Sequence, residues 1–142
     1  MLKVAINGFG RIGRSAFKIV IDKFSDSLEI VAINDIADAK TLAHLLKYDS
    51  NYGIWPHQVI SDEKSITVDQ KVYQVLNEKD PQNLPWKDLQ VNVVIESTGK
   101  FADKAGASQH IQAGSKKVVI SAPVKGESSE VKTFLLGVNG DK

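Results

Sequence analysis

Residues 4–14 read Val-Ala-Ile-Asn-Gly-Phe-Gly-Arg-Ile-Gly-Arg, and this stretch decides the fold that the sequence predicts. A short apolar strand, expected over residues 3–6, runs into Gly8, Gly10 and Gly13, which have the spacing G-x-G-x-x-G. Apolar residues then recur three and four positions apart, which predicts a helix over residues 11–24. In a dinucleotide-binding turn, the three glycines permit a tight turn, a close approach of the backbone to a pyrophosphate, and close packing of the helix on the sheet.

An acidic residue supports this interpretation of the glycines. Asp35 ends a second buried strand, predicted over residues 29–34, and it lies 22 residues after Gly13. A carboxylate at this place can accept hydrogen bonds from an adenosine ribose, while the free N–H groups at the start of the helix favour a pyrophosphate. The alternative is a glycine-rich turn beside a surface aspartate, with no ligand. A protein-kinase glycine loop fits less well, because its glycines join two strands rather than a strand and a helix.

The rest of the chain alternates between strand and helix patterns. We expect further helices over residues 39–48 and 102–113, and further strands over residues 91–96, 117–121 and 133–138. The middle of the chain predicts short antiparallel strands over residues 59–60, 65–68 and 72–76, then a single helical turn led by residues 84–86. The pattern favours an α/β fold with a mostly parallel sheet, helices on both of its faces and a short antiparallel insertion.

Small hydroxyl residues follow two of the later strands. Ser97-Thr98-Gly99 comes after the strand that ends at Glu96, and Ser121-Ala122-Pro123 after the strand over residues 117–121. Ligands of open α/β sheets bind outside the carboxyl ends of the strands, so these segments indicate a ligand-binding rim. Taken alone, each segment is explained equally well as an ordinary turn.

Composition narrows the possible functions. The 142 residues suffice for one domain, and 18 basic against 17 acidic residues leave a net charge of +1 without a run of five or more like charges. We therefore expect neither a nucleic-acid nor a membrane partner, since both need a concentrated basic field. The chain has no cysteine, which excludes disulfides, thiolate zinc sites and a cysteine nucleophile within it. No apolar stretch is long enough for a signal peptide or a membrane span, and a cytoplasmic location is expected.

Residues 7–14, Asn-Gly-Phe-Gly-Arg-Ile-Gly-Arg, strongly resemble the opening of the phosphorylating, NAD-dependent glyceraldehyde-3-phosphate dehydrogenases. Further matches follow along the whole chain at residues 32–35, 46–50, 78–81, 96–99, 120–123 and 137–139. The resemblance implies that residues 1–142 are the N-terminal nucleotide-binding domain of such an enzyme, with a Rossmann-type doubly wound fold.

The resemblance also implies a set of NAD-binding residues, which are Asn7, Gly8, Phe9, Gly10, Arg11, Ile12, Gly13, Asp35, Lys79, Ser97, Thr98, Gly99, Phe101 and Ser121. The backbone and side chains of residues 7–12 would line the cofactor, and Asp35 would bind the adenosine ribose. Lys79 would lie beside the adenine, where the family usually has Arg, so a main-chain contact would survive while stacking by a guanidinium would be lost. Residues 97–101 would flank the central part of NAD, and Ser121 would approach its nicotinamide half.

For the parent enzyme, the resemblance implies attack of a thiolate on a sugar-phosphate aldehyde, hydride transfer to NAD, and release of the acyl group to inorganic phosphate as 1,3-bisphosphoglycerate. This is a reaction of glycolysis and gluconeogenesis, carried out by a homotetramer. The family's catalytic cysteine is expected shortly after Asn139, and the chain ends at Lys142. We therefore expect the catalytic domain to be absent from this chain. His44, His57 and His110 match no catalytic position and are predicted to be surface or structural residues.

Three alternatives remain at this point. Erythrose-4-phosphate dehydrogenase also resembles the sequence, but it typically has Glu at the position of Asp35. A stand-alone, non-catalytic dinucleotide-binding or regulatory module is the second alternative. The third is an interaction protein that kept the fold and lost the ligand, against which saturable NAD binding would count.

Overall fold

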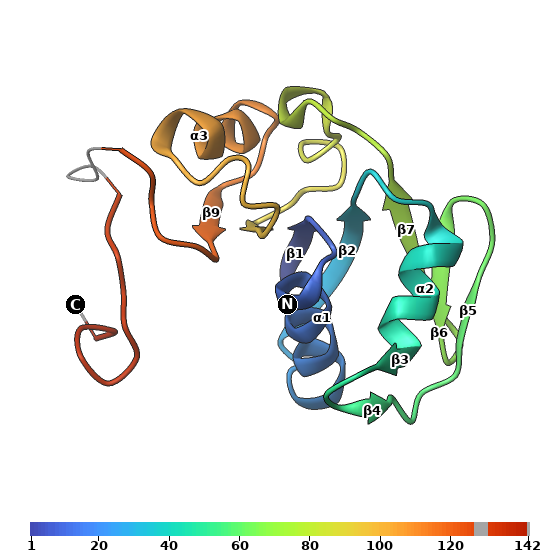
Figure 1. The fold of residues 1–142 in the computed structure, drawn as a ribbon. Helices are drawn as coiled ribbons and strands as arrows, with labels where there is room; N and C mark the ends of the chain where they lie inside the picture. The colour runs from blue at the N-terminus through green and yellow to red at the C-terminus, as the bar shows by residue number, and fades with distance from the viewer. Residues whose placement is uncertain (127–130, 142) are drawn as a thin grey trace.

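A seven-stranded sheet forms the centre of the molecule in the computed structural model, which describes residues 1–126 and 131–141 (Figure 1). In chain order the elements are β1 (Leu2–Asn7), α1 (Arg11–Lys23), β2 (Leu28–Asn34), α2 (Ala39–Lys47), β3 (Tyr48–Asp49), β4 (Gly53–Ile54), β5 (Val59–Ser61), β6 (Ser65–Val68), β7 (Lys71–Leu76), the 3-10 turn η1 (Pro81–Asn83), β8 (Val93–Glu96), α3 (Lys104–Gln112) and β9 (Lys117–Ile120).

The strands lie in the order β5-β6-β7-β2-β1-β8-β9. The five strands from β7 to β9 run parallel, whereas β5 and β6 extend the β7 edge as an antiparallel hairpin. The chain passes from β1 to β2 on one side and later places β8 on the other side of β1. This reversal is the switch point at which doubly wound sheets bind ligands. The predicted Rossmann-type class with a short antiparallel insertion is confirmed.

Each face of the sheet buries its own apolar layer. Val4 and Ile6 of β1 point to one face, where α1 and α2 pack, and Phe17 of α1 is fully buried there. Ala5 points to the opposite face because side chains alternate along a strand. There it meets a layer around the fully buried Trp86, on the side of the sheet that α3 covers. Helices therefore cover both faces, as the strand–helix alternation predicts.

Most predicted elements are present, with ends moved by at most two residues, but one predicted strand needs correction. Residues 133–138 form an irregular segment and a turn instead of a strand, and they run on the far side of β9 from the rest of the sheet. The helical turn expected after residues 84–86 is present, since the backbone N–H of Leu89 donates to the carbonyl oxygen of Pro85 at 3.0 Å. A separate 3-10 turn over Pro81–Asn83, in which the Asp80 side chain accepts from the backbone N–H of Gln82, was not predicted. The hairpin of β3 and β4 was not predicted.

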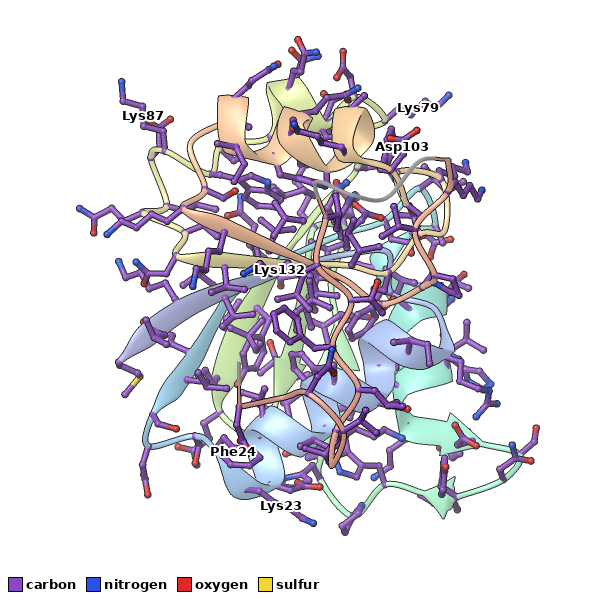
Figure 2. All side chains as sticks on the ribbon, turned by 90° about the vertical axis from the view of Figure 1, so that its left-hand side faces the viewer. Lys23, Phe24, Lys79, Lys87, Asp103 and Lys132 are labelled. Atoms are coloured by element: carbon purple, nitrogen blue, oxygen red, sulfur yellow. The ribbon has the colours of Figure 1, made fainter. Side chains whose placement is uncertain are left out.

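Figure 2 places the two ends of the molecule. Lys79 and Asp103 lie at the end of the sheet where the parallel strands finish, and Lys23 and Phe24, the last residue and the C-cap of α1, lie at the opposite end. The end of the sheet near Lys79 is therefore the edge at which ligands of doubly wound sheets bind. Among the described residues no helix is both long and apolar enough to cross a membrane.

Candidate functional site

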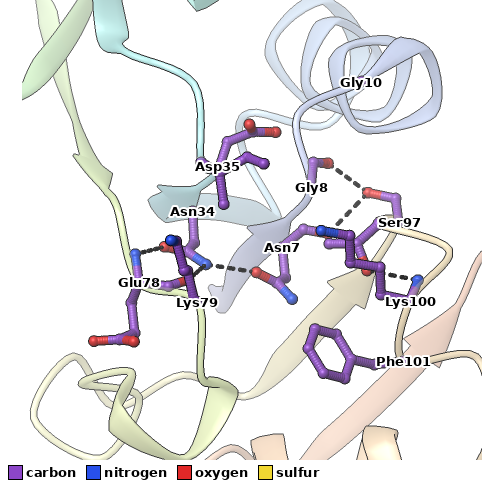
Figure 3. A pocket seen from close by; sticks show the side chains of 12 residues that line it. Asn7, Gly8, Gly10, Asn34, Asp35, Glu78, Lys79, Ser97, Lys100 and Phe101 are labelled. Carbon is purple, nitrogen blue, oxygen red and sulfur yellow. Dashed lines mark hydrogen bonds between the residues drawn. The ribbon is translucent and has the colours of Figure 1, made fainter.

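A pocket of about 560 Å³ opens at the carboxyl ends of β1, β2 and β8 (Figure 3). The residues that line it are Asn7, Gly8, Gly10, Asn34, Asp35, Ile36, Glu78, Lys79, Ser97, Thr98, Lys100 and Phe101. The pocket lies at the switch point of the sheet, where the strand order predicts a ligand site. Eight of the fourteen predicted cofactor-binding residues are among its lining residues.

The glycines shape one wall of this pocket. Gly8 has a φ of +90°, and a Cβ there would stand 2.6 Å from the backbone nitrogen of Thr98, so no other residue fits. A Cβ on Gly13 would overlap the carbonyl oxygen of Gly8, which means that α1 packs directly on the glycine loop. Gly10 is different, because a Cβ there would meet no atom within 4 Å. The space over Gly10 belongs to the pocket, which fits the approach of a ligand to the bare backbone.

The start of α1 differs from the starts of α2 and α3. Asp38 and Asp103 cap α2 and α3 by accepting hydrogen bonds from backbone N–H groups of the first turn. The N-cap of α1 is Gly10, which has no side chain to accept such a bond, and the first turn holds no acidic residue. The first N–H groups of a helix need acceptors and carry its positive dipole end, so this turn is suited to an anionic group.

Asp35 joins the glycine loop to the end of β2. Its Oδ2 accepts a hydrogen bond from the backbone N–H of Phe9 at 2.7 Å, and its Oδ1 accepts one from Ala37 at 2.9 Å. The carboxylate is thus held in the pocket wall by two backbone donors. Each of its oxygens keeps a further lone pair for a ligand hydroxyl.

Ser97 joins the glycine loop to β8 on the other side. Its hydroxyl donates to the carbonyl oxygen of Gly8 at 2.6 Å (Figure 3), and its backbone N–H donates to the carbonyl oxygen of Asn7 at 2.8 Å. Three adjacent strand ends are therefore tied to one another around the pocket, which gives it rigid walls.

Six predicted site residues lie outside the pocket lining. Phe9 turns its ring into the core, 5.5 Å from the ring of Phe17, so it can face a ligand only through its backbone. Arg11 is exposed and forms a 3.2 Å ion pair with Asp49. Ser121 lines a second hollow, between α3 and the segment after β9. The remaining three are Ile12, which is exposed, and the glycines Gly13 and Gly99.

Sequence reasoning missed four lining residues, Asn34, Ile36, Glu78 and Lys100. Two of them flank Asp35, and the other two flank predicted site residues, Glu78 before Lys79 and Lys100 after Gly99. The signal that could have found Asn34 is its place as the last residue of an apolar strand, a place that Asn7 shares in β1.

The three histidines lie in different environments, and none of them lines the pocket. His44 is exposed on α2. His57 lies between two carboxylates, with its Nδ1 2.7 Å from Asp69 and its Nε2 2.9 Å from Asp22. The hydrogen bond to Asp69, and then that to Asp22, raise the pKa of His57 against the opposing effect of burial. His110 is fully buried and hydrogen-bonded, in agreement with the prediction of a structural or surface residue.

Comparisons with known proteins agree with this geometry. Residues 2–104 match the family described as glyceraldehyde 3-phosphate dehydrogenase, NAD binding domain. The chain is 52% identical over 142 residues to the glyceraldehyde-3-phosphate dehydrogenase of Thermotoga maritima, a match that covers the whole chain and 42% of the relative. It is 50% identical to the enzyme of Borreliella burgdorferi, covering 97% of the chain and 41% of that relative. The chloroplastic enzyme of Gracilaria gracilis is 49% identical, over 97% of the chain and 33% of its own length. The chain thus spans 33–42% of the length of these relatives.

Proposed function

The chain belongs to the glyceraldehyde-3-phosphate dehydrogenase family, in which it matches the NAD-binding domain, and from this we propose that NAD binds in the pocket between β1, β2 and β8. The observation that carries the proposal is the placement of Asp35 in the wall of this pocket, beside an open Gly10. An acceptor for ribose hydroxyls and a bare backbone at a helix start are the two features that bind the adenosine and pyrophosphate parts of a dinucleotide.

The proposed orientation follows from the chemistry of the walls. The adenosine would lie between Asp35 and the loop that carries Lys79, and the pyrophosphate would lie over Gly10 at the start of α1. The rest of the cofactor would then run along the segment after β8, past Thr98 and Phe101. For Arg11, Ile12 and Ser121, side-chain contact with the cofactor stays a prediction.

The activity of the whole enzyme is a further part of the proposal. NAD supplies a hydride acceptor, and the residues of this chain bind it and orient it toward a sugar-phosphate aldehyde. We propose that residues 1–142 act as one NAD-binding domain and that the attacking thiolate, the general base and the phosphate sites come from outside them, since this sequence has no cysteine. A homotetramer and a cytoplasmic location are proposed for the parent enzyme on the same family grounds.

Calorimetric titration of the 142-residue chain tests cofactor binding. We expect saturable binding of NAD with a dissociation constant on the order of 0.1–1 mM, because this chain carries the residues proposed to bind the adenosine and pyrophosphate but only part of those proposed for the nicotinamide. ADP-ribose, which lacks the nicotinamide, should compete about as well as NAD. An absence of saturation up to roughly 10 mM would favour an interaction protein that kept the fold and lost the ligand.

A further inference from the structure

A row of buried polar side chains crosses the sheet directly beneath the pocket. Asn34 donates from its Nδ2 to Oδ1 of Asn7 at 2.7 Å, and Asn7 donates from its Nδ2 to Oε2 of Glu96 at 2.6 Å. Nε2 of His110 lies 2.7 Å from the same Oε2. None of the four residues is more than 3% exposed. The row is straight because Asn34, Asn7 and Glu96 are register partners on neighbouring parallel strands and so point to the same face.

The row holds both walls of the pocket. At one end Asn34 exchanges two hydrogen bonds with the backbone of Glu78, whose N–H donates to Asn34 and whose carbonyl accepts from it, both at 2.9 Å (Figure 3). At the other end Oε1 of Glu96 accepts hydrogen bonds from the backbone N–H and the hydroxyl of Thr98. Glu78 and Thr98 line the pocket on opposite sides, so a shift in the row moves both walls.

Glu96 is ionised at the centre of this row. Burial by itself raises the pKa of its carboxyl, but the hydrogen bonds from His110, Thr98 and Asn7 together outweigh that effect and hold the pKa below its usual range. A buried carboxylate depends on its donors, because each missing one leaves a charge without a partner. The orientation of Glu96 is therefore set by which neighbours donate to it.

Trp86 determines which ring nitrogen of His110 carries the proton. The indole Nε1–H of Trp86 lies 3.0 Å from Nδ1 of His110, and an indole nitrogen can only donate. Nδ1 must therefore accept, which places the ring proton on Nε2, where it donates to Glu96. Trp86 and His110 are both fully buried, and neither lines the pocket. The hydrogen bond from Trp86 therefore leaves Nε2–H of His110 as the one ring donor, and it points at Glu96.

We propose that His110 is a positioning residue of the cofactor site, acting through Glu96 rather than by contact with a ligand. Its Nε2–H holds the Glu96 carboxylate in the orientation that receives Asn7 on one oxygen and Thr98 on the other. Loss of that donor leaves Oε2 with Asn7 alone and frees the carboxylate to turn toward either partner. The part of this inference that concerns NAD rests on the proposed function, whereas the part that concerns the two pocket walls does not.

Two amide substitutions of His110 separate positioning from simple loss of structure. His110→Gln carries an amide N–H to about the place of Nε2 and can still donate to Glu96. His110→Asn is shorter, so it can accept from Trp86 but cannot reach Glu96. Both variants remove the imidazole ring and both reduce the packing density at the same buried position. A role in packing alone predicts that the two variants behave alike.

Hydrogen exchange in the ligand-free chain is the first measurement. We expect His110→Asn to speed exchange at the backbone N–H groups of Thr98 and Glu78, and His110→Gln to leave both near the rate of the unsubstituted chain. The N–H of Gln58, which donates to Asp69 in the distant hairpin, is the control amide and should not change in either variant. Unchanged exchange at Thr98 and Glu78 in His110→Asn overturns the proposal, as does an equal increase in the two variants.

NAD affinity is the second measurement. His110→Asn should weaken binding about tenfold, the equivalent of 1.4 kcal/mol, and His110→Gln should recover most of that loss. If His110→Asn does not fold, Glu96→Gln replaces it, because an amide removes one of the two acceptors and should also speed exchange at Thr98; no change there overturns the proposal. Failure of the unsubstituted chain to bind NAD refutes the proposed function, and the exchange pattern still decides the role of His110.

Discussion

Gly10, the N-cap of α1, and Gly13, in the first turn of α1, stand three residues apart, yet the structure predicts opposite consequences for an added methyl group. A Cβ on Gly13 would come closer than 3.0 Å to the carbonyl oxygen of Gly8, so α1 would have to move off the loop and pull Phe17 out of its packed layer. Overpacking of this kind costs about 1–3 kcal/mol, and a clash with backbone belongs at the upper end. With roughly 4 °C of Tm per kcal/mol for a chain of this size, Gly13→Ala should lower the Tm by about 12 °C.

Gly10→Ala should instead leave the fold nearly unchanged. Its φ of −77° and ψ of −158° are open to alanine, and a Cβ meets no atom within 4 Å. Alanine is a poorer N-cap than glycine but costs less chain entropy, so the net change should stay within about 1 kcal/mol. The methyl group would enter the space proposed for the pyrophosphate, and NAD binding should weaken at least about tenfold, or 1.4 kcal/mol.

Thermal unfolding and NAD titration of the two variants, side by side, check this reasoning. The expected pattern is a stable variant that binds NAD poorly for Gly10→Ala and a destabilised one for Gly13→Ala. A Gly10→Ala variant that binds NAD as tightly as the unsubstituted chain would refute the placement of the pyrophosphate. A Gly13→Ala variant with an unchanged Tm would refute the close packing of α1 on the loop.

Three further predictions concern selectivity, pH and activity. Asp35→Gly should bring the affinities for NAD and NADP close together, because it removes the carboxylate that favours two free ribose hydroxyls and repels a 2′-phosphate. Asp38→Asn removes the same charge at the cap of α2, and it should leave the ratio of the two affinities unchanged in the same titrations. Since the pKa of His57 is raised, first by Asp69 and then by Asp22, the stability that it contributes is fully present below about pH 6.5 and is lost as pH rises through its folded pKa. The difference in Tm between the unsubstituted chain and His57→Gln should therefore shrink from acid to alkaline pH, and a constant difference would contradict the assignment. The chain given aldehyde, phosphate and NAD should form no NADH above a blank without protein, and phosphate-dependent turnover would refute the assignment of the thiolate to residues outside it.

Local patterns made the first three elements of the fold predictable. The spacing of Gly8, Gly10 and Gly13 demands a loop, and the periodic apolar residues after it demand a helix, so β1, α1 and β2 follow from neighbouring residues alone. The same holds for the pocket, because parallel strands with right-handed crossovers bring their carboxyl ends to one rim. Asp35 and Thr98 could be placed at that rim from the sequence for this reason.

The strand predicted over residues 133–138 shows where local patterns fail. Apolar residues such as Phe134 and Leu136 favour a strand, but a strand is stable only when its backbone pairs with a neighbour. Here the backbone N–H of Leu135 donates to the side chain of Asn139, and Leu136 is 96% exposed. Pairing is a property of the assembled sheet, so no window of sequence can report it.

The sequence by itself determined the strand–glycine loop–helix unit, the class of fold and the family, because each depends on residue types at fixed distances along the chain. Only the tertiary structure decided which oxygens Asp35 offers to Phe9 and Ala37, and that His110, on α3, supports a pocket it does not touch. Those facts depend on the register of β2, β1 and β8, which aligns Asn34, Asn7 and Glu96. Register is set by the packing of whole strands against both faces of the sheet, and one residue of slip would turn these side chains into the opposite layer.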